Sequence, residues 1–189
     1  MQIALIIAVV LVILIIVFFT SYNGLVKTNE RVDEAWSDIT VQLKRRADLV
    51  PNLVEVVKGY AKHETEAIKA VSDARAKMMG ARSVESNAEA DKSLTGALSR
   101  LMAVSESYPE LKANTNFQQL TSELSDTEDK IQAARRFYNA GVKEINTKIK
   151  MFPSNIINNL FGHFKKREYY NVDDAEKERI DKAPTVNFS

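Results

Sequence analysis

The sequence contains no cysteine and little glycine or proline, and these shortages narrow the classes of protein that it can encode. Without cysteine the chain can form no disulfide, carry no lipid on an N-terminal cysteine and offer no thiolate to zinc or to a substrate. Only 6 Gly and 4 Pro occur in 189 residues, which favours long helices with few turns. Basic and acidic residues number 26 and 25, so no broad field of one sign attracts nucleic acid.

Side chains suited to catalysis are scarce as well. The two His residues, His63 and His163, lie about a hundred positions apart, and no second His follows His63 at the spacing of a zinc-binding helix. The carboxylates in Asp126–Lys130 are typical of a solvated helix face, where acid–base work is rare. We therefore predict a protein that is not an enzyme, with no catalytic residue, no metal ligand and no cofactor.

One long apolar run is present at the N-terminal end. Residues Ile3 to Phe19 carry no charge, and at about 1.5 Å of helical rise per residue they just span a hydrocarbon core of about 30 Å. A cleaved secretory signal and a buried core helix are the alternatives. Aromatic side chains end the run, and these suit a membrane interface better than a peptidase site. We predict an uncleaved transmembrane anchor at residues 1–22.

Positive charges decide the predicted orientation of this anchor. No basic side chain precedes the apolar run, whereas Lys27 and Arg31 follow it closely and Lys44–Arg46 come later. Basic residues beside a span favour the cytoplasmic side, so we predict a cytoplasmic soluble domain. The opposite orientation stays open, because only two of these charges lie within the effective range.

After the anchor, apolar residues recur in alternating steps of three and four or their multiples, which indicates a helix packed against its neighbours. The pattern contains Val32, Trp36, Ile39, Leu43, Val50, Leu53, Val57, Tyr60, Ala67, Val71, Ala74 and Met78. Arg46 and Glu64 occupy two further positions in it. Pro51 disfavours helix just before it, but the phase continues, so we predict one kinked helix over about residues 24–79.

Three more helical stretches follow a loop predicted at residues 80–90. The second helix leads to Pro109, which either ends it or opens the next helix. The third spans about residues 110–150, and Gly141 within it indicates either close approach of a neighbouring helix or local flexibility. Pro153 opens a fourth, shorter helix.

These stretches predict an all-α fold. A single transmembrane helix is followed by an antiparallel four-helix bundle with a long, kinked first helix. We place the bundle at residues 23–170 and an extended C-terminal tail at residues 171–189.

Two basic clusters are candidates for contact with an anion or a lipid headgroup. They consist of Lys44, Arg45 and Arg46 in one and Lys165, Lys166 and Arg167 in the other. The alternative for Arg46 is a packed stem whose guanidinium reaches solvent or a carboxylate such as Glu128 or Asp129. The segment Phe152–Arg167 either lies on a membrane surface or closes the end of the bundle.

Several runs of the chain together resemble the LemA family. They are Tyr22-Asn23 with Leu25, Gln42–Val54, Tyr108–Asn114, Thr127–Ile131, Ala134–Asn139, Phe152-Pro153 and Val186 with Phe188. The resemblance covers essentially the whole chain, with one small departure: Ala47 stands where the family pattern has His. It implies an N-terminal span, an antiparallel four-helix domain, a place in the bacterial inner membrane and no known enzymatic activity.

We therefore expect a membrane-anchored helical scaffold or interaction protein. Its expected partners are the lipid bilayer, further copies of itself or other membrane proteins, and not nucleic acid. The alternative is membrane remodelling or lipid sensing through the two basic clusters and the segment Phe152–Arg167.

Overall fold

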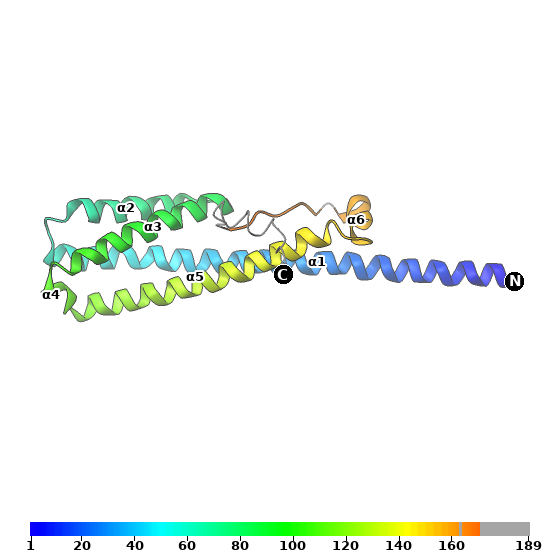
Figure 1. Ribbon diagram of the computed structural model, residues 1–189, viewed down its shortest axis with the longest axis horizontal. Coiled ribbons are helices and arrows are strands. Elements are labelled where there is room, and N and C mark those ends of the chain that lie inside the picture. The colour runs from blue at the N-terminus through cyan, green and yellow to red at the C-terminus, as the bar shows by residue number, and fades with distance from the viewer. Residues whose placement is uncertain (163, 171–189) are drawn as a thin grey trace, which may run out of the picture. The chain divides into compact units, whose positions relative to one another are not determined.

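The computed structural model describes residues 1–162 and 164–170, and every regular element in that part of the chain is a helix (Figure 1). The helices are α1 (Gln2–Tyr60), α2 (Thr65–Gly80), α3 (Val84–Ser105), α4 (Pro109–Lys112), α5 (Thr115–Lys148) and α6 (Ser154–Ile157), followed by the π-helix η1 (Asn158–Gly162). The predicted all-α class is confirmed. His163 and the tail predicted at residues 171–189 lie outside the described residues.

Contacts between residues divide the chain into two compact units, each with its own core. Unit 1 contains residues 1–42 and 128–168, and unit 2 contains residues 43–127 and resumes at residue 169. The core of unit 1 includes Leu25, Val32, Ile39, Ile131, Tyr138, Val142 and Ile145, and that of unit 2 includes Leu43, Val50, Leu53, Val57, Val71, Leu94, Leu101 and Leu111. Most of these residues belong to the three-and-four spacing of the sequence.

Helix α1 begins at Gln2, one residue before the apolar run, and continues without a break to Tyr60. The helix predicted over residues 24–79 is therefore wrong at both ends. Its far end comes early because Gly59 has the lowest helix propensity apart from proline, and α2 starts as a separate helix at Thr65.

Pro51 does not interrupt α1. Leu53 and Val57 beyond it are fully buried, and burying two such side chains contributes about as much as the roughly 3 kcal/mol that a proline costs inside a helix. The prediction that the helix continues across Pro51, which was based on the unbroken apolar spacing, is therefore confirmed.

Helices α2 and α3 pack together and are joined by the short segment Ala81–Ser83. The loop predicted at residues 80–90 is wrong, because α3 begins at Val84. The Ser83 hydroxyl accepts a hydrogen bond from the Ser86 N–H at 3.1 Å, and the Ser86 hydroxyl accepts one from the Ser83 N–H at 2.9 Å. This reciprocal cap satisfies N–H groups at the start of α3.

The third predicted stretch divides into two helices. Pro109 opens the short helix α4, and α5 begins after Asn114, whose side-chain oxygen accepts a hydrogen bond from the Phe117 N–H at 3.0 Å. Gly141 lies against another helix as predicted: a Cβ there would meet Val32 Cγ2 at 3.1 Å. The fourth stretch is also helical, as α6 and η1.

Candidate membrane-proximal site

The apolar run forms the first part of α1 with its side chains facing outward. An 18-residue window of this helix has a mean hydropathy of 3.5, and none of it is buried. Burial along α1 begins only at Leu25 and then recurs at Thr28 and Val32. A single helix thus changes from an exposed apolar surface to a packed element with one buried face, and its first part is long and apolar enough to cross a membrane.

Residues 164–168, which we call the strap, lie beside α5 in unit 1 and have no regular structure. The side-chain amide of Asn146 donates to the Arg167 carbonyl at 2.9 Å, and its oxygen accepts from the Arg167 N–H at 2.8 Å. The Tyr138 hydroxyl donates to the Glu168 carbonyl at 3.0 Å. Two side chains of α5 therefore supply the hydrogen bonds that a neighbouring strand would otherwise give to this backbone.

Burial raises the pKa of the Tyr138 hydroxyl, and the carboxylates of Glu168 and Asp33 add to the effect while the Arg167 charge opposes it. The hydroxyl consequently keeps its proton at neutral pH, and the hydrogen bond that it donates to the strap persists.

The guanidinium of Arg167 ties the strap to α1. It donates to both carboxylate oxygens of Asp33, at 2.7 and 2.9 Å, and to the side-chain oxygen of Asn29 at 2.9 Å. Because the two charged side chains are 36% and 46% exposed, solvent screens the pair and we assign it at most about 1 kcal/mol. Arg167 is thus occupied by protein carboxylate, whereas Lys165 and Lys166 are exposed.

A tight turn precedes the strap. The buried side chain of Asn158 accepts from the Phe164 N–H at 2.8 Å and donates to the Phe164 carbonyl at 3.0 Å. A Cβ at Gly162 would lie 2.6 Å from Asn158 Oδ1 and 2.9 Å from the Phe164 ring. Only glycine fits there without displacing the side chain that closes the turn.

Aromatic rings connect this turn to the end of the apolar run. The Phe18 ring packs edge-on against the Phe161 ring at 5.1 Å between centroids, and the Tyr22 ring lies 6.3 Å from that of Phe164. Phe18 also stacks on Tyr22 at 6.2 Å. The segment that follows α5 therefore returns to the part of α1 where the apolar run ends.

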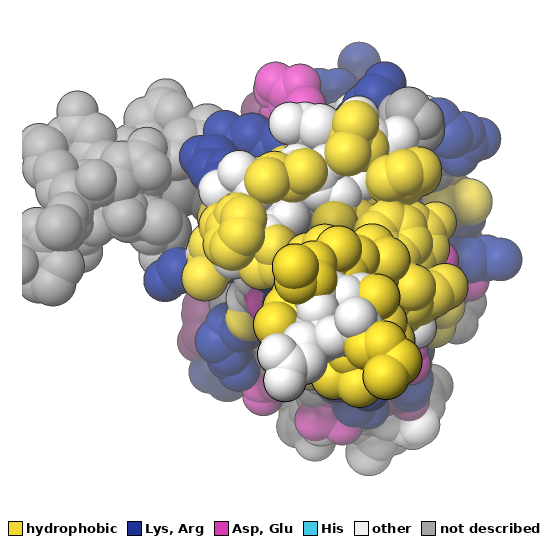
Figure 2. Space-filling model, turned by 90° about the vertical axis from the view of Figure 1, so that its right-hand side faces the viewer, with side chains coloured by type: hydrophobic (Ala, Val, Ile, Leu, Met, Phe, Trp, Pro, Cys, Tyr) yellow, Lys and Arg dark blue, Asp and Glu magenta, His cyan; other side chains and the backbone are white. Residues whose placement is uncertain are grey.

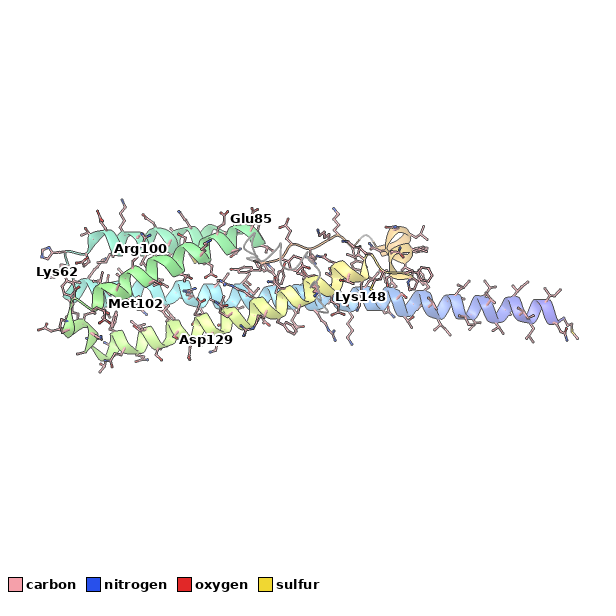
Figure 3. All side chains as sticks on the ribbon, in the orientation of Figure 1. Lys62, Glu85, Arg100, Met102, Asp129 and Lys148 are labelled. Carbon is pink, nitrogen blue, oxygen red and sulfur yellow. The ribbon has the colours of Figure 1, made fainter. Side chains whose placement is uncertain are left out.

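A second polar contact between α1 and α5 lies nearby. Lys148 (Figure 3) donates to Glu144 at 2.7 Å and to the Thr28 hydroxyl at 2.7 Å. The hydrogen bond from Lys148 lowers the pKa of the Glu144 carboxyl, helped by the Lys148 charge, Thr28 and Arg31, against a smaller effect of burial. Glu144 therefore carries its charge at neutral pH.

The first basic cluster belongs to unit 2, and one of its members is internal. Arg46 is 4% exposed and its guanidinium contacts the Asp91 carboxylate at 2.8 Å, while Lys44 and Arg45 are exposed. The Tyr170 hydroxyl lies 3.4 Å from the other Asp91 oxygen. The sequence placed Arg46 correctly on the packed face, and the contact that the structure shows there is with Asp91, a carboxylate that the sequence did not suggest.

Sequence reasoning missed Asp91 as a partner of Arg46 and Tyr170 as a neighbour of Asp91. A signal for Asp91 exists, since Asp91, Leu94, Leu98 and Leu101 continue the three-and-four spacing and all are buried. The expectation of a loop up to residue 90 concealed it. Tyr170 follows the strap and lies on no periodic pattern.

The described residues contain no group of three or more His, Cys, Asp or Glu side chains able to hold a metal ion. His63 is exposed, and the acidic residues Asp126 and Asp129 lie on exposed positions of α5. The contacts described around the end of the apolar run are hydrogen bonds, ion pairs and aromatic contacts, and together they hold the strap against α1 and α5.

Comparison with known proteins gives consistent matches. Residues 35–188 match the model of the LemA family. The chain is 30% identical over 167 residues to Protein LemA of Metamycoplasma hominis, covering 84% of this chain and 72% of that protein. It is 28% identical over 175 residues to Magnetosome protein MamQ 2 of Paramagnetospirillum magneticum, covering 79% and 64%. Magnetosome protein MamQ of Magnetospirillum gryphiswaldense is 28% identical over 186 residues, covering 85% and 68%.

Proposed function

The chain belongs to the LemA family, and on that premise we propose that it is a single-pass membrane protein whose helical domain acts as a scaffold for other proteins rather than as an enzyme. The observation that carries the proposal is the continuity of α1. The same helix that exposes an uncharged apolar surface over its first turns provides buried residues to unit 1 from Leu25 onward.

The continuity of α1 has a mechanical consequence for the domain that it enters. At about 1.5 Å per residue, the 59 residues of α1 extend for about 89 Å, and no break separates the apolar part from the packed part. A helix that passes from lipid into a domain core holds that domain at a fixed distance and rotation. Such an arrangement suits a protein that presents surfaces to partners beside the bilayer.

The proposed domain is an antiparallel four-helix bundle in which α1, α2, α3 and α5 take part. Short connections between helices support it, because a chain that turns within a few residues places consecutive helices side by side. The connections 61–64 and 81–83 are of this kind. We further propose that the domain lies in the cytoplasm and that copies associate through it.

Exposed apolar side chains on unit 1 supply a surface for such association. Val41 and Phe137 are 57% and 60% exposed, and Phe137 helps to line a shallow hollow of about 420 Å³ with Ala35, Ala133 and Ala134. An exposed aromatic beside small residues is a common feature of protein interfaces.

Two measurements test the proposal on the full-length chain. Alkaline carbonate should leave the protein in the membrane pellet, whereas release into the supernatant refutes the anchor. Crosslinking in nanodiscs should give dimers or larger species that Phe137→Ser reduces and the exposed control Gln132→Ser does not. A strictly monomeric protein refutes self-association, and a reporter fused after residue 189 that is active only outside the cytoplasm refutes the orientation.

Lipid sensing is the second candidate function. Lys165 and Lys166 are exposed and follow directly on an apolar segment, which is the composition of an anionic-membrane contact. Anionic nanodiscs should then stabilise the wild-type protein against heat relative to zwitterionic ones, and Lys165→Gln with Lys166→Gln should remove the difference. Equal stabilisation of both proteins argues against this function.

A further inference from the structure

Five large apolar side chains around α6 and η1 are largely exposed. They form what we call the apolar patch, which consists of Met151, Phe152, Ile156, Leu160 and Phe161, with exposed fractions between 49% and 77%. Figure 2 views the molecule from the end where the apolar run of α1 lies, and hydrophobic side chains gather over that end. A soluble domain rarely leaves so many large apolar side chains together in water.

The opposite side of the same segment is packed. Ile157 is 7% exposed, and the buried Asn158 holds the turn through both of its hydrogen bonds to Phe164. The two interpretations of Phe152–Arg167 offered by the sequence thus describe two faces of one segment. One face packs on the domain, and the apolar patch is the other.

The aromatic contacts fix the level of the apolar patch along α1. Phe161 packs on Phe18, which is one residue from the end of the run Ile3–Phe19. If that run fills the hydrocarbon core, Phe18 lies at its border, since about 17 residues of helix extend for about 26 Å. Phe161 then lies at the border as well, beside the point where α1 leaves the membrane.

The charged residues around the apolar patch are consistent with a position at the border of the hydrocarbon core. No acidic residue occurs between positions 149 and 167, and the exposed residues Lys150, Lys165 and Lys166 lie on either side of the patch in sequence. Lysine side chains beside an apolar surface can reach phosphate groups while the apolar atoms enter the acyl region.

We propose that the apolar patch lies in the headgroup–acyl boundary of the leaflet in which the apolar run of α1 ends, as a second membrane contact beside the transmembrane span. This inference rests on the proposed anchoring of α1. It adds a function for α6 and η1: a span touches the bilayer along one axis, and a second contact prevents rotation about that axis. The lipid bilayer is thus the partner of this surface.

The absence of cysteine allows a direct test, because one introduced cysteine is then the sole labelling position. Leu160→Cys and Phe152→Cys report on the apolar patch, Ala8→Cys on the span and Ser37→Cys on exposed α1 about 25 Å beyond Thr20. Each full-length variant is labelled with a fluorophore and reconstituted into vesicles of phosphatidylcholine and phosphatidylglycerol. Lipids carrying a quencher near the headgroup or deep in the acyl chain are then compared.

We expect the shallow quencher to reduce fluorescence at Leu160 and Phe152 several-fold more than at Ser37. The deep quencher should act most strongly at Ala8. All four positions are exposed, so each variant should retain the helical circular dichroism of the parent protein.

Three outcomes separate the inference from its premise. If the labels at Leu160 and Phe152 behave like that at Ser37 while Ala8 is quenched, the anchor stands and the membrane contact of the apolar patch is refuted. If these labels instead quench one another between copies, a second copy covers the patch and the inference is equally overturned. If Ala8 escapes the deep quencher, the anchoring itself is wrong.

Discussion

Replacement of Asp91 by Ala should destabilise unit 2 far more than loss of an exposed acidic residue that makes an equally short contact. Arg46 and Asp91 approach to 2.8 Å with side chains that are 5% and 0% exposed. Lys112 and Glu106 approach to 2.7 Å with side chains that are 59% and 67% exposed. The two pairs differ in burial and hardly in distance.

Burial of each ion pair determines how much free energy of unfolding its loss should remove. Asp91→Ala leaves a buried guanidinium without this carboxylate, and breaking a buried ion pair costs about 3–5 kcal/mol. Glu106→Ala removes a solvated pair worth about 0.2–1 kcal/mol. Against a total free energy of unfolding of about 5–15 kcal/mol for an ordinary domain, the first change removes a large share and the second very little.

Denaturation by urea of the full-length protein in detergent, followed by helical circular dichroism, measures both effects as shifts of the midpoint. The double variant Arg46→Met with Asp91→Leu should recover most of the lost stability, because a packed apolar pair replaces a buried ionic one at little cost. Equal midpoint shifts for Asp91→Ala and Glu106→Ala would refute the assignment of Arg46 and Asp91 to the core.

Three further predictions concern unit 1. Gly162→Ala brings a methyl group against Asn158 and should speed proteolysis of the strap; an unchanged rate speaks against the tight turn. Asn146→Ala removes the side chain that bonds two strap backbone groups and should lower stability by about 1–3 kcal/mol in thermal unfolding; an unchanged unfolding temperature contradicts this role of Asn146. Glu144 has a lowered pKa, so its contribution is present above its ordinary value of 4.5 and is lost as pH falls through the folded value; Glu144→Gln should flatten this acid limb, and an identical pH profile contradicts the contact with Lys148.

Periodicity predicted the packed faces well because burial of apolar area is what orders them. Val32, Ile39, Leu43, Leu53 and Val57 all lie in a core, as the three-and-four spacing required. The same signal could not locate the end of α1. Ala67 and Val71 continue the spacing beyond the break at residues 61–64, so the pattern reads as one helix where the chain forms two.

Capping explains the missed start of α3. A Ser followed three positions later by Glu or Gln is the usual sequence sign of a helix start, but here Ser86 takes the place of that residue. The hydroxyl makes the same reciprocal bonds, and only the structure shows it. Family resemblance, by contrast, identified the LemA family correctly from short runs of residues.

The strap lay beyond prediction from sequence for a different reason. Its backbone is held by Asn146 and Tyr138, about twenty to thirty positions earlier in the chain, and such long-range side-chain bonds leave no periodic trace. The role of Lys165, Lys166 and Arg167 as an anion or lipid contact stays a prediction. Only the fold distinguishes Arg167, bound to Asp33, from its two exposed neighbours.

Helix α1 is unbroken from Phe19 to Leu25. The number of residues between these two positions therefore sets the rotation of the packed part of the helix, about the helix axis, relative to the apolar part. Each residue added there would turn the helix beyond it by about 100° and advance it by about 1.5 Å relative to the apolar turns before it. One extra alanine would rotate the strap and its turn away from Phe18. Seven extra residues would restore nearly the original rotation, about 10 Å further along the helix axis. With the anchoring that we propose, the length of this spacer, more than the identity of its side chains, would decide which face of unit 1 points in a given direction along the membrane plane.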